Sequence, residues 1–313
     1  MAGSGGIVVT GASGFIGGYL LPRIEAAFPG RTIIPLGGPA SSRFRPVDLA
    51  DPDSLRRALS DVPFDTLIHL AAQSSVAGAI NAPEAVWRAN ALGAMTVARL
   101  VADLSPEALV IHAGSAECYG ESFMSGQPLD ETACLKPANP YARSKVAAEL
   151  ALTDILPASA KLVLLRLFNH TGPGQDERFV VPSFAAQIAR AETLETGGVI
   201  EVGDLTAQRD FGHVDDAAAA IVAVMTAAGR LPRISTFNVC TESARPVQDI
   251  LDALLALARR PVSVKADPAR MRPSSIGVAA GSSAALRAAT GWRPGKSFDQ
   301  TIDEVLAYWR KQV

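Results

Sequence analysis

The chain has 313 residues, of which 48% are hydrophobic and 19% charged, and its formal net charge at pH 7 is −2. This is the composition of a globular protein with a sizeable core, and the lack of a basic excess argues against a nucleic-acid partner. No apolar stretch is long enough to span a bilayer, no signal peptide precedes the first apolar segment, and the three cysteines form no CxxC pair. We therefore expect a reduced, cytoplasmic protein with no membrane partner and no metal site.

Short apolar segments alternate with longer segments rich in alanine and leucine through the first half of the chain. Successive apolar residues predict strands buried on both faces at 6–10, 32–36, 66–70, 109–113 and 161–168. Helices are expected near 15–28, 52–60, 83–103 and 141–155. This alternation predicts an α/β fold with a doubly wound parallel sheet of the Rossmann type. Pro35 suggests an edge position for the second strand, and Pro22 a kink in the first helix.

The pattern changes after residue 168. Residues 168–182 are rich in Gly and Pro and predict a loop, followed by a helix at 183–192 and a strand at 199–203. Residues 236–240 predict a further strand of the main sheet, and the chain ends with a helix at 298–310. We expect a Rossmann domain formed by 1–168 and 213–241. A smaller C-terminal substrate-binding lobe would comprise 169–212 and 242–313.

Three glycines, Gly11, Gly14 and Gly17, follow the first predicted strand and open the first helix. Glycines at this spacing allow a sharp turn and a close approach of the backbone to a pyrophosphate, toward which the N–H groups of the helix point. Their position between strand and helix predicts a dinucleotide site.

The segment after the second strand bears on the choice of cofactor. An acidic residue at the end of this strand accepts a hydrogen bond from the ribose of NAD, but here Ser41, Ser42, Arg43 and Arg45 follow instead. Hydroxyl and guanidinium groups accommodate a 2′-phosphate, so the sequence favours NADP(H). If this loop is only solvated, NAD(H) would serve equally.

A catalytic set is predicted on the next two elements. Tyr141 and Lys145 are four residues apart on one helix, and Ser115 ends the strand before it. A lysine ammonium near a phenol lowers the pKa of the phenol, which makes tyrosine a usable proton donor, and a serine hydroxyl at this edge of the sheet can hold a carbonyl oxygen. The four histidines have no metal-ligand spacing.

Together these motifs resemble the extended short-chain dehydrogenase/reductase family, and the resemblance covers essentially the whole chain. It implies that Ser115, Tyr141 and Lys145 are catalytic. It also implies a set of cofactor-binding residues, in which Asp48 would reach the adenine: Gly11, Ser13, Gly14, Phe15, Ile16, Gly17, Asp48, Leu49, Leu70, Ala71, Ala72, Tyr141, Lys145 and Leu167.

Several segments, among them FNHTGPGQ (168–175) and VGDLTAQRDF (202–211), resemble more narrowly the GDP-4-keto-6-deoxy-mannose reductases, which make GDP-rhamnose. This resemblance implies NAD(P)H-dependent reduction of the C4 keto group of GDP-4-keto-6-deoxy-D-mannose to GDP-D-rhamnose. Arg209 and Arg272 would grip the diphosphate. The implied substrate-binding residues are Ser75, Glu117, Asn169, Val180, Arg209 and Arg272.

Two alternatives stay open. In a nucleotide-sugar 4,6-dehydratase or a 4-epimerase the same three residues would act with a recycled cofactor, and Glu117, two residues after Ser115, has the spacing of a dehydratase acid–base group. The second alternative is a non-catalytic dinucleotide sensor. The intact set of Ser115, Tyr141 and Lys145 argues against it, because such sensors commonly lose the tyrosine. Apolar residues on more than one face of helices 83–103 and 141–155 predict a homodimer that pairs these helices, as the family does.

Overall fold

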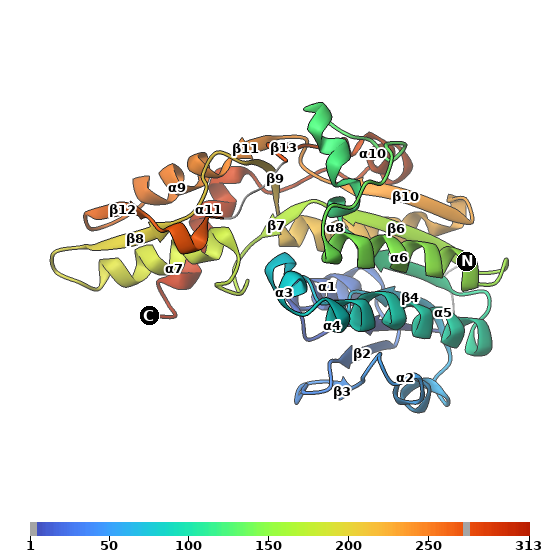
Figure 1. Cartoon of the computed structure of the whole chain (residues 1–313). Coiled ribbons are helices and arrows are strands. Elements are labelled where there is room, and N and C mark those ends of the chain that lie inside the picture. Colours follow the sequence, from blue (N-terminus) through green and yellow to red (C-terminus); the bar gives the residue numbers. More distant parts are fainter. Residues whose placement is uncertain (1–4, 272–275) are drawn as a thin grey trace.

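The fold is built on a central parallel sheet, seen in a computed structural model that describes residues 5–271 and 276–313 (Figure 1). The seven strands lie in the order β10-β6-β5-β4-β1-β2-β3, and every neighbouring pair is parallel. The strands are β1 (Gly6–Thr10), β2 (Ile33–Gly37), β3 (Arg45–Pro46), β4 (Phe64–His69), β5 (Leu109–Ala113), β6 (Lys161–Leu167) and β10 (Ile234–Val239). The predicted doubly wound α/β fold is therefore confirmed.

Helices cover both faces of this sheet. The helices α1 (Phe15–Ala27) and α8 (Val214–Ala227) share a core with Ile7 and Val9, whose side chains leave β1 on one face. The helices α2 (Pro52–Leu59), α5 (Gly93–Leu104) and α6 (Pro140–Ile155) share a second core with Val8 on the opposite face. Successive residues of β1 thus enter different cores, which explains the continuous apolar run of this strand.

The expected edge position of the second strand is wrong, because the two-residue strand β3 pairs with β2 at Leu36 and Gly37. Pro35 lies just before this pairing. The carbonyls of Thr32 and Leu36 accept hydrogen bonds from the β1 side, whereas that of Gly37 accepts from the β3 side. Backbone groups of successive residues in a strand point to opposite sides, so the nitrogen of Pro35 points away from β1. The pairing with β3 begins only at Leu36, so no N–H donor is needed at Pro35. The helix α1 continues through Pro22 as a single element.

The helix expected at 83–103 is interrupted by a π-helical turn. It consists of α4 (Pro83–Trp87), the π-turn η1 (Arg88–Leu92) and then α5, and the short helix α3 (Val76–Asn81) precedes it. Such turns widen a helix by one residue and redirect its side chains. Short 3₁₀ turns occur elsewhere: η2 (Ala116–Tyr119), η3 (Glu121–Ser125), η4 (Ala228–Arg230) and η5 (Pro268–Arg270).

A smaller lobe lies beside the sheet (Figure 1). Its core joins the helices α7 (Val180–Glu192), α9 (Val247–Ala256) and α11 (Phe298–Trp309) with a pair of parallel strands, β8 (Gly198–Val202) and β12 (Val262–Ala266). A four-stranded sheet is centred on β9 (Gln208–His213), which pairs with β7 (Asn169–Thr171), β11 (Ala244–Pro246) and β13 (Val278–Ala279). The short helix α10 (Ala284–Thr290) returns to pack against α8 and β10.

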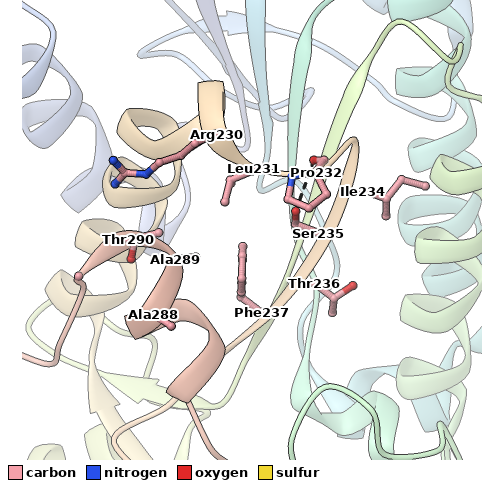
Figure 2. A pocket seen from close by; sticks show the side chains of 11 residues that line it. Arg230, Leu231, Pro232, Ile234, Ser235, Thr236, Phe237, Ala288, Ala289 and Thr290 are labelled. Atoms are coloured by element: carbon pink, nitrogen blue, oxygen red, sulfur yellow. Dashed lines mark hydrogen bonds between the residues drawn. The ribbon is translucent and has the colours of Figure 1, made fainter.

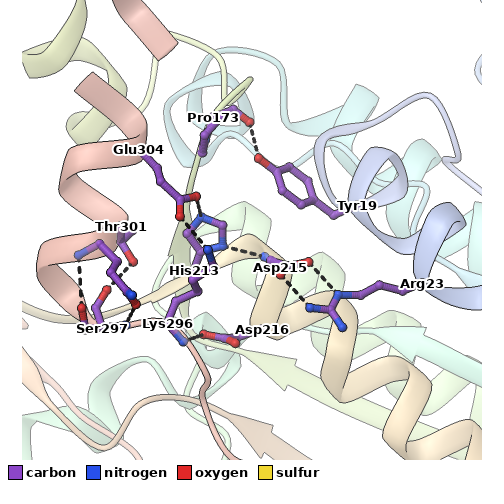
Figure 3. Close-up of polar contacts among 11 residues, drawn as sticks. Tyr19, Arg23, Pro173, His213, Asp215, Asp216, Lys296, Ser297, Thr301 and Glu304 are labelled. Carbon is purple, nitrogen blue, oxygen red and sulfur yellow. Dashed lines mark hydrogen bonds and ion pairs between the residues drawn. The ribbon is translucent and has the colours of Figure 1, made fainter. Parts of the chain in front are cut away.

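Polar contacts join the lobe to the sheet helices (Figure 3). Arg23 on α1 makes two 2.6 Å hydrogen bonds to the carboxylate of Asp215 on α8. His213, which caps α8 by accepting from the backbone N–H of Asp215, lies 3.3 Å from the carboxylate of Glu304 on α11. Tyr19 donates to the carbonyl oxygen of Pro173 at 2.8 Å. Helices α1, α8 and α11 are thereby held together around His213.

Within the described ranges, every helix is too short or too polar to cross a bilayer.

Candidate active site

The glycine turn after β1 has the backbone that its sequence predicts. Gly11 has φ +71°, and a Cβ there would lie 2.6 Å from the backbone nitrogen of Ala71. A Cβ on Gly17 would lie 2.5 Å from the carbonyl oxygen of Ala12. Both positions therefore exclude a side chain, Gly11 also by its conformation. The turn brings β1, β4 and α1 close together.

The N-terminus of α1 fits an anion. Gly14 is its N-cap and makes no side-chain capping hydrogen bond, and the first turn contains no acidic residue. Ser13 and Gly14 are exposed, and Phe15 and Ile16 are half-buried. An uncapped, accessible first turn offers its N–H groups and the positive end of the helix dipole to a pyrophosphate, so these residues fit a dinucleotide.

The other residues predicted to bind the cofactor gather at the same edge of the sheet. Leu70 and Ala71 follow β4, and their N–H groups donate to the backbone and side-chain oxygens of Thr10. Asp48 is exposed and its carboxylate accepts from the N–H of Ala50. Leu49 lies near Gly93, Ala72 is exposed, and Leu167 ends β6. The carboxyl ends of parallel strands are where such sheets bind ligands.

The two arginines after β2 differ in their surroundings. Arg45 belongs to β3, and its guanidinium donates a 2.6 Å hydrogen bond to the carbonyl oxygen of Ala58 at the end of α2. It therefore stabilises the packing of α2. Arg43 is exposed, and its guanidinium lies 4.8 Å from the centre of the Phe44 ring. Of this pair, Arg43 is the better placed to meet a 2′-phosphate.

Ser115 and Tyr141 meet at the end of β5. Ser115 is buried and caps the turn η2, where its hydroxyl accepts from the N–H of Glu117 at 3.2 Å. Tyr141 lies in the first turn of α6, which Asn139 caps by accepting from the N–H of Ala142. The Ser115 hydroxyl lies near the Tyr141 phenol and lowers the pKa of that phenol against the effect of burial. The structure thus brings the two predicted groups close together.

The pKa of Tyr141 differs from the prediction. Burial raises it well above its ordinary value of 10.0, and the Ser115 hydroxyl opposes the rise. Lys145 follows one turn later, and its ammonium donates a 2.6 Å hydrogen bond to the carbonyl oxygen of Ala113. Burial lowers the pKa of Lys145 to about 8. The expected lowering of the phenol pKa is therefore wrong, because burial is the stronger effect.

Asn90 is a polar residue of the site that the sequence did not single out. It lies in the π-turn η1 and is buried. Its side chain bonds both the N–H and the carbonyl of Gln73, at 2.9 and 3.2 Å. It also donates to the hydroxyl of Ser144 on α6 at 2.9 Å. Asn90 thereby ties the segment after β4 to the helix that carries Tyr141 and Lys145.

Glu117 and Arg209 face the same region from the two lobes. The Glu117 carboxylate accepts from the side chain of Asn139 at 3.1 Å. Burial lowers the pKa of Arg209 on β9, while the charges of Glu117 and Asp204 raise it. Arg209 also donates to the carbonyl oxygen of Gln208 at 2.9 Å. Arg272, the second predicted diphosphate ligand, lies outside the described residues.

The remaining predicted substrate residues lie on separate elements. Ser75 caps α3 by accepting from the N–H of Gly78 at 3.0 Å. Asn169 is exposed in β7, a strand that replaces part of the loop expected at 168–182, and Val180 is the half-buried first residue of α7. Among the residues that the structure describes, no His, Cys, Asp and Glu side chains cluster as metal ligands.

One pocket lies away from these residues. It has a volume of about 680 Å³ and follows the outer edge of β10, between that strand and α10 (Figure 2). None of the predicted site residues lines it. A cavity of about 20 Å³ at the carboxyl ends of β6 and β10 is lined by Leu167, Asn169 and His170, among others. The geometry of Ser115 and Tyr141, rather than pocket size, therefore locates the candidate site.

Comparisons with known proteins agree with this geometry. The NAD dependent epimerase/dehydratase family matches residues 7–240. GDP-6-deoxy-D-mannose reductase of Pseudomonas aeruginosa is 32% identical over 310 residues, which cover 98% of each chain. The solved structure of RMD from Pseudomonas aeruginosa complexed with NADPH has a TM-score of 0.86 at 29% identity, covering 99% of this chain and 100% of that one.

A UDP-glucose 4-epimerase has a similar structure. The Thermus thermophilus enzyme in complex with NAD has a TM-score of 0.84 at 27% identity, and the match covers 98% of this chain and 99% of that one. Reductase and epimerase relatives thus share one fold with this chain. The chain belongs to the NAD dependent epimerase/dehydratase family and is an NAD(P)-dependent oxidoreductase of the extended short-chain type.

Proposed function

We propose that this enzyme uses NAD(P)H to reduce the C4 keto group of a nucleotide-activated 4-keto-6-deoxy sugar, converting GDP-4-keto-6-deoxy-D-mannose to GDP-D-rhamnose. The observation that carries the proposal is the 32% identity to a GDP-6-deoxy-D-mannose reductase over 98% of both chains. The closeness of Ser115 and Tyr141 supports it, because the proposed carbonyl-orienting hydroxyl lies beside the proposed proton donor.

Each of the three proposed catalytic residues has a role that its surroundings support. Tyr141 is the proton donor to the sugar O4, since a phenol carries its proton at neutral pH and this one lies beside Ser115. Ser115 orients the carbonyl oxygen beside that phenol. Lys145 supplies a positive charge one turn away, for Tyr141 and for the cofactor ribose. A bound nicotinamide cofactor supplies the hydride.

The nucleotide part of the substrate is proposed to lie between the lobes. Arg209 on β9 is half-buried and feels the charge of Glu117, so a diphosphate there would meet a guanidinium in a partly dehydrated place. Ser75, Glu117, Asn169, Val180 and Arg272 complete the proposed set. Residues 1–168 with 213–241 are proposed as the cofactor domain, and 169–212 with 242–313 as the substrate lobe.

The decisive experiment is incubation with GDP-4-keto-6-deoxy-D-mannose and NADPH. We expect one NADPH to be oxidised for each sugar consumed, and NMR of the product to identify GDP-D-rhamnose by its C4 configuration. Consumption of the keto sugar without oxidation of NADPH would contradict a reductase.

A 4,6-dehydratase or 4-epimerase is the second candidate. The position of Glu117 favours it, because its carboxylate lies two residues after Ser115 and is held by Asn139 at 3.1 Å. Incubation with GDP-mannose and catalytic amounts of NADP⁺ tests this candidate: a 4-keto-6-deoxy product would support the dehydratase. In the reductase we assign Glu117 to contact with the substrate.

We also propose a homodimer that pairs α5 and α6 with their copies. Large apolar side chains are exposed on this side of the molecule: Ile80 at 62%, Trp87 at 41%, Leu92 at 50% and Leu150 at 58%. Trp87 and Leu92 lie in the predicted segment 83–103 and Leu150 in the predicted segment 141–155, whereas Ile80 belongs to the neighbouring α3. Exposed apolar side chains on both segments support the pairing. Light scattering that shows a monomer at micromolar concentration would reject this proposal.

A further inference from the structure

A buried ion pair lies behind the proposed catalytic residues. Glu149 and Arg166 are joined by two hydrogen bonds of 2.9 and 3.2 Å, and their side chains are 5% and 8% exposed. Replacing such a pair with apolar residues often leaves stability unchanged or improves it, so burial alone does not account for it. Its place relative to Lys145 suggests another role.

Glu149 lies on the helix of Lys145 and packs against two further parts of the candidate site. It lies on α6, one helical turn after Lys145. Gly114, the residue before Ser115, is so close that a Cβ added to it would lie only 3.1 Å from the Oε1 atom of Glu149. The same oxygen is 3.9 Å from the thiol of Cys118, in the turn that Ser115 caps. The carboxylate therefore packs against both sides of the Ser115 turn.

Arg166 extends this contact to the rest of the turn. Its guanidinium donates to the hydroxyl of Tyr119 at 3.1 Å and lies 5.0 Å from the centre of that ring. Tyr119, in turn, donates to Asn238 on β10 at 2.7 Å. Arg166 belongs to β6, so the Ser115 turn is fixed to two strands as well as to α6.

We propose that Glu149 is a positioning residue of the candidate active site: fixed by Arg166, its carboxylate holds the Ser115 turn against α6 and supplies the negative charge that keeps Lys145 an ammonium. This inference rests on the proposed function for the role of Lys145. In this proposal Glu149 touches neither substrate nor cofactor but sets the charge of Lys145, which is proposed to contact the cofactor.

The groups around Lys145 support the electrostatic part. Burial lowers the pKa of His69 on β4 to about 3 and that of His112 on β5 well below 6.5, and the charge of Lys145 adds to both effects. Both rings are therefore neutral near pH 7. Burial likewise raises the pKa of the Cys118 thiol to about 12 and that of Tyr141 above its ordinary value.

Glu149 is consequently the negative charge close to Lys145 at neutral pH. Burial lowers the pKa of Lys145 to about 8, and the charge of Glu149 raises it against that effect. Without this carboxylate the pKa of Lys145 would fall further, toward neutral pH. A larger fraction of the Lys145 side chain would then be an uncharged amine.

NMR titration of the ligand-free protein tests the charge directly. The chain has only six lysines, so the side-chain Cε signals of ¹³C-labelled lysine are few, and Lys145→Met assigns the signal of interest. In Glu149→Gln we expect the titration midpoint of Lys145 to fall by about one pH unit or more. The alkaline limb of the pH profile of kcat should move down by a similar amount.

A second variant separates the charge from the packing. Glu149→Gln leaves the Arg166 charge buried without a carboxylate, which destabilises the fold, whereas Glu149→Gln with Arg166→Met removes both charges. We expect the double variant to recover thermal stability, with a Lys145 midpoint between those of the single variant and the wild type. Recovery of the wild-type midpoint in the double variant would overturn the proposal, as would an unchanged midpoint in Glu149→Gln.

A matched control lies in the substrate lobe. Glu192 accepts two 2.7 Å hydrogen bonds from Arg310 and its side chain is 8% exposed, so Glu192→Gln breaks a comparable pair elsewhere. It should lower stability and leave the Lys145 titration unmoved. Because the titration needs no substrate, a shifted midpoint without reduction of the keto sugar rejects only the proposed function. Turnover with an unmoved midpoint rejects only the role of Glu149.

Discussion

The side-chain amide of Asn90 donates a 2.9 Å hydrogen bond to the hydroxyl of Ser144, which itself donates to the carbonyl oxygen of Tyr141. This chain of hydrogen bonds joins the π-turn η1 to the first turn of α6. The same amide group of Asn90 holds both backbone groups of Gln73. One buried side chain therefore fixes the helix with the proposed proton donor and the segment beside the proposed cofactor site.

Replacing Asn90 with Ala should weaken both the fold and catalysis. The change removes both hydrogen bonds to the backbone of Gln73 and the one to Ser144, at a cost of about 1 kcal/mol or more in the free energy of unfolding. Urea denaturation measures this loss, and kcat should fall while the protein still folds. Ser144→Ala, which removes one of the contacts, serves as the milder control. An Asn90→Ala protein as stable and active as wild type would contradict the positioning role.

Tyr141→Phe should keep the fold and the affinity for NADPH but lose turnover. The missing hydroxyl is the proposed proton donor, and positioned acid–base groups contribute ~10²–10⁴-fold to the rate. Steady-state rates and the thermal midpoint check the two parts of this prediction. Tyr308→Phe on α11 is the control for removal of a tyrosine hydroxyl away from the site. Rates within a factor of about three of wild type would rule out Tyr141 as the donor, since that is far below the expected loss.

Arg43 should determine the preference for NADPH. No acidic residue follows β2, Arg45 is engaged with Ala58, and Arg43 is exposed at the end of this segment. Arg43→Ala should raise the dissociation constant of NADPH about tenfold or more, since charged hydrogen bonds contribute about 1.5–3 kcal/mol. The dissociation constant of NADH should stay nearly unchanged. Fluorescence titration gives both dissociation constants. A tenfold preference of the wild type for NADH would refute the NADP(H) proposal.

Arg209→Ala should raise KM for the nucleotide sugar by roughly ten- to a hundredfold, which corresponds to one lost charged hydrogen bond. NADPH affinity should barely change, because the proposed cofactor site is the glycine turn after β1. Comparing KM for the sugar with Kd for NADPH separates the two sites. Equal weakening of both ligands, or of neither, would show that Arg209 does not hold the diphosphate.

Stability should fall as pH drops below about 6.5, the ordinary histidine pKa. Burial lowers the pKa of all four histidines, His69, His112, His170 and His213. The unfolded chain then binds protons that the folded protein does not. For His69, whose pKa in the folded protein is about 3, this costs about 1 kcal/mol one unit below the ordinary pKa, and the other three histidines act in the same direction. Thermal midpoints between pH 5.5 and 7.5 should rise with pH.

His213→Asn provides the control for this pH dependence. Asparagine also caps helices, so it can replace the acceptor for the N–H of Asp215 without adding a titratable group. The variant should show a weaker dependence on pH. A midpoint that does not vary over this range, or a His213→Asn variant with the full slope, would show that the folded protein accepts these protons.

Local sequence signals predicted much of this fold. The buried strands, the turn at Gly11 and the pair Tyr141 and Lys145 depend on residues close together in the chain, and the structure has them at the expected places. Asn90 could not be found in this way, because its partners Gln73 and Ser144 are brought to it only by tertiary packing.

Two other differences have the same origin. The strand β7 pairs with β9 more than thirty residues later, so its segment alone looked like a loop. The pKa of Tyr141 depends on the burial of the ring, which packs with Ala79 of α3 and Val86 of α4, and the spacing to Lys145 carries no information about that burial. Distance along the chain thus limits what sequence patterns reveal about electrostatics.

The core of the substrate lobe has a consequence for how the protein is made. It combines Phe184 of α7, Leu251 of α9 and Val305 of α11, so its parts are separated by more than a hundred residues. During translation the Rossmann strands up to β6 emerge first and can pair, whereas α7 must wait for α11 before its apolar face is covered. The nascent lobe therefore keeps part of its apolar surface exposed until the last helix of the chain has emerged.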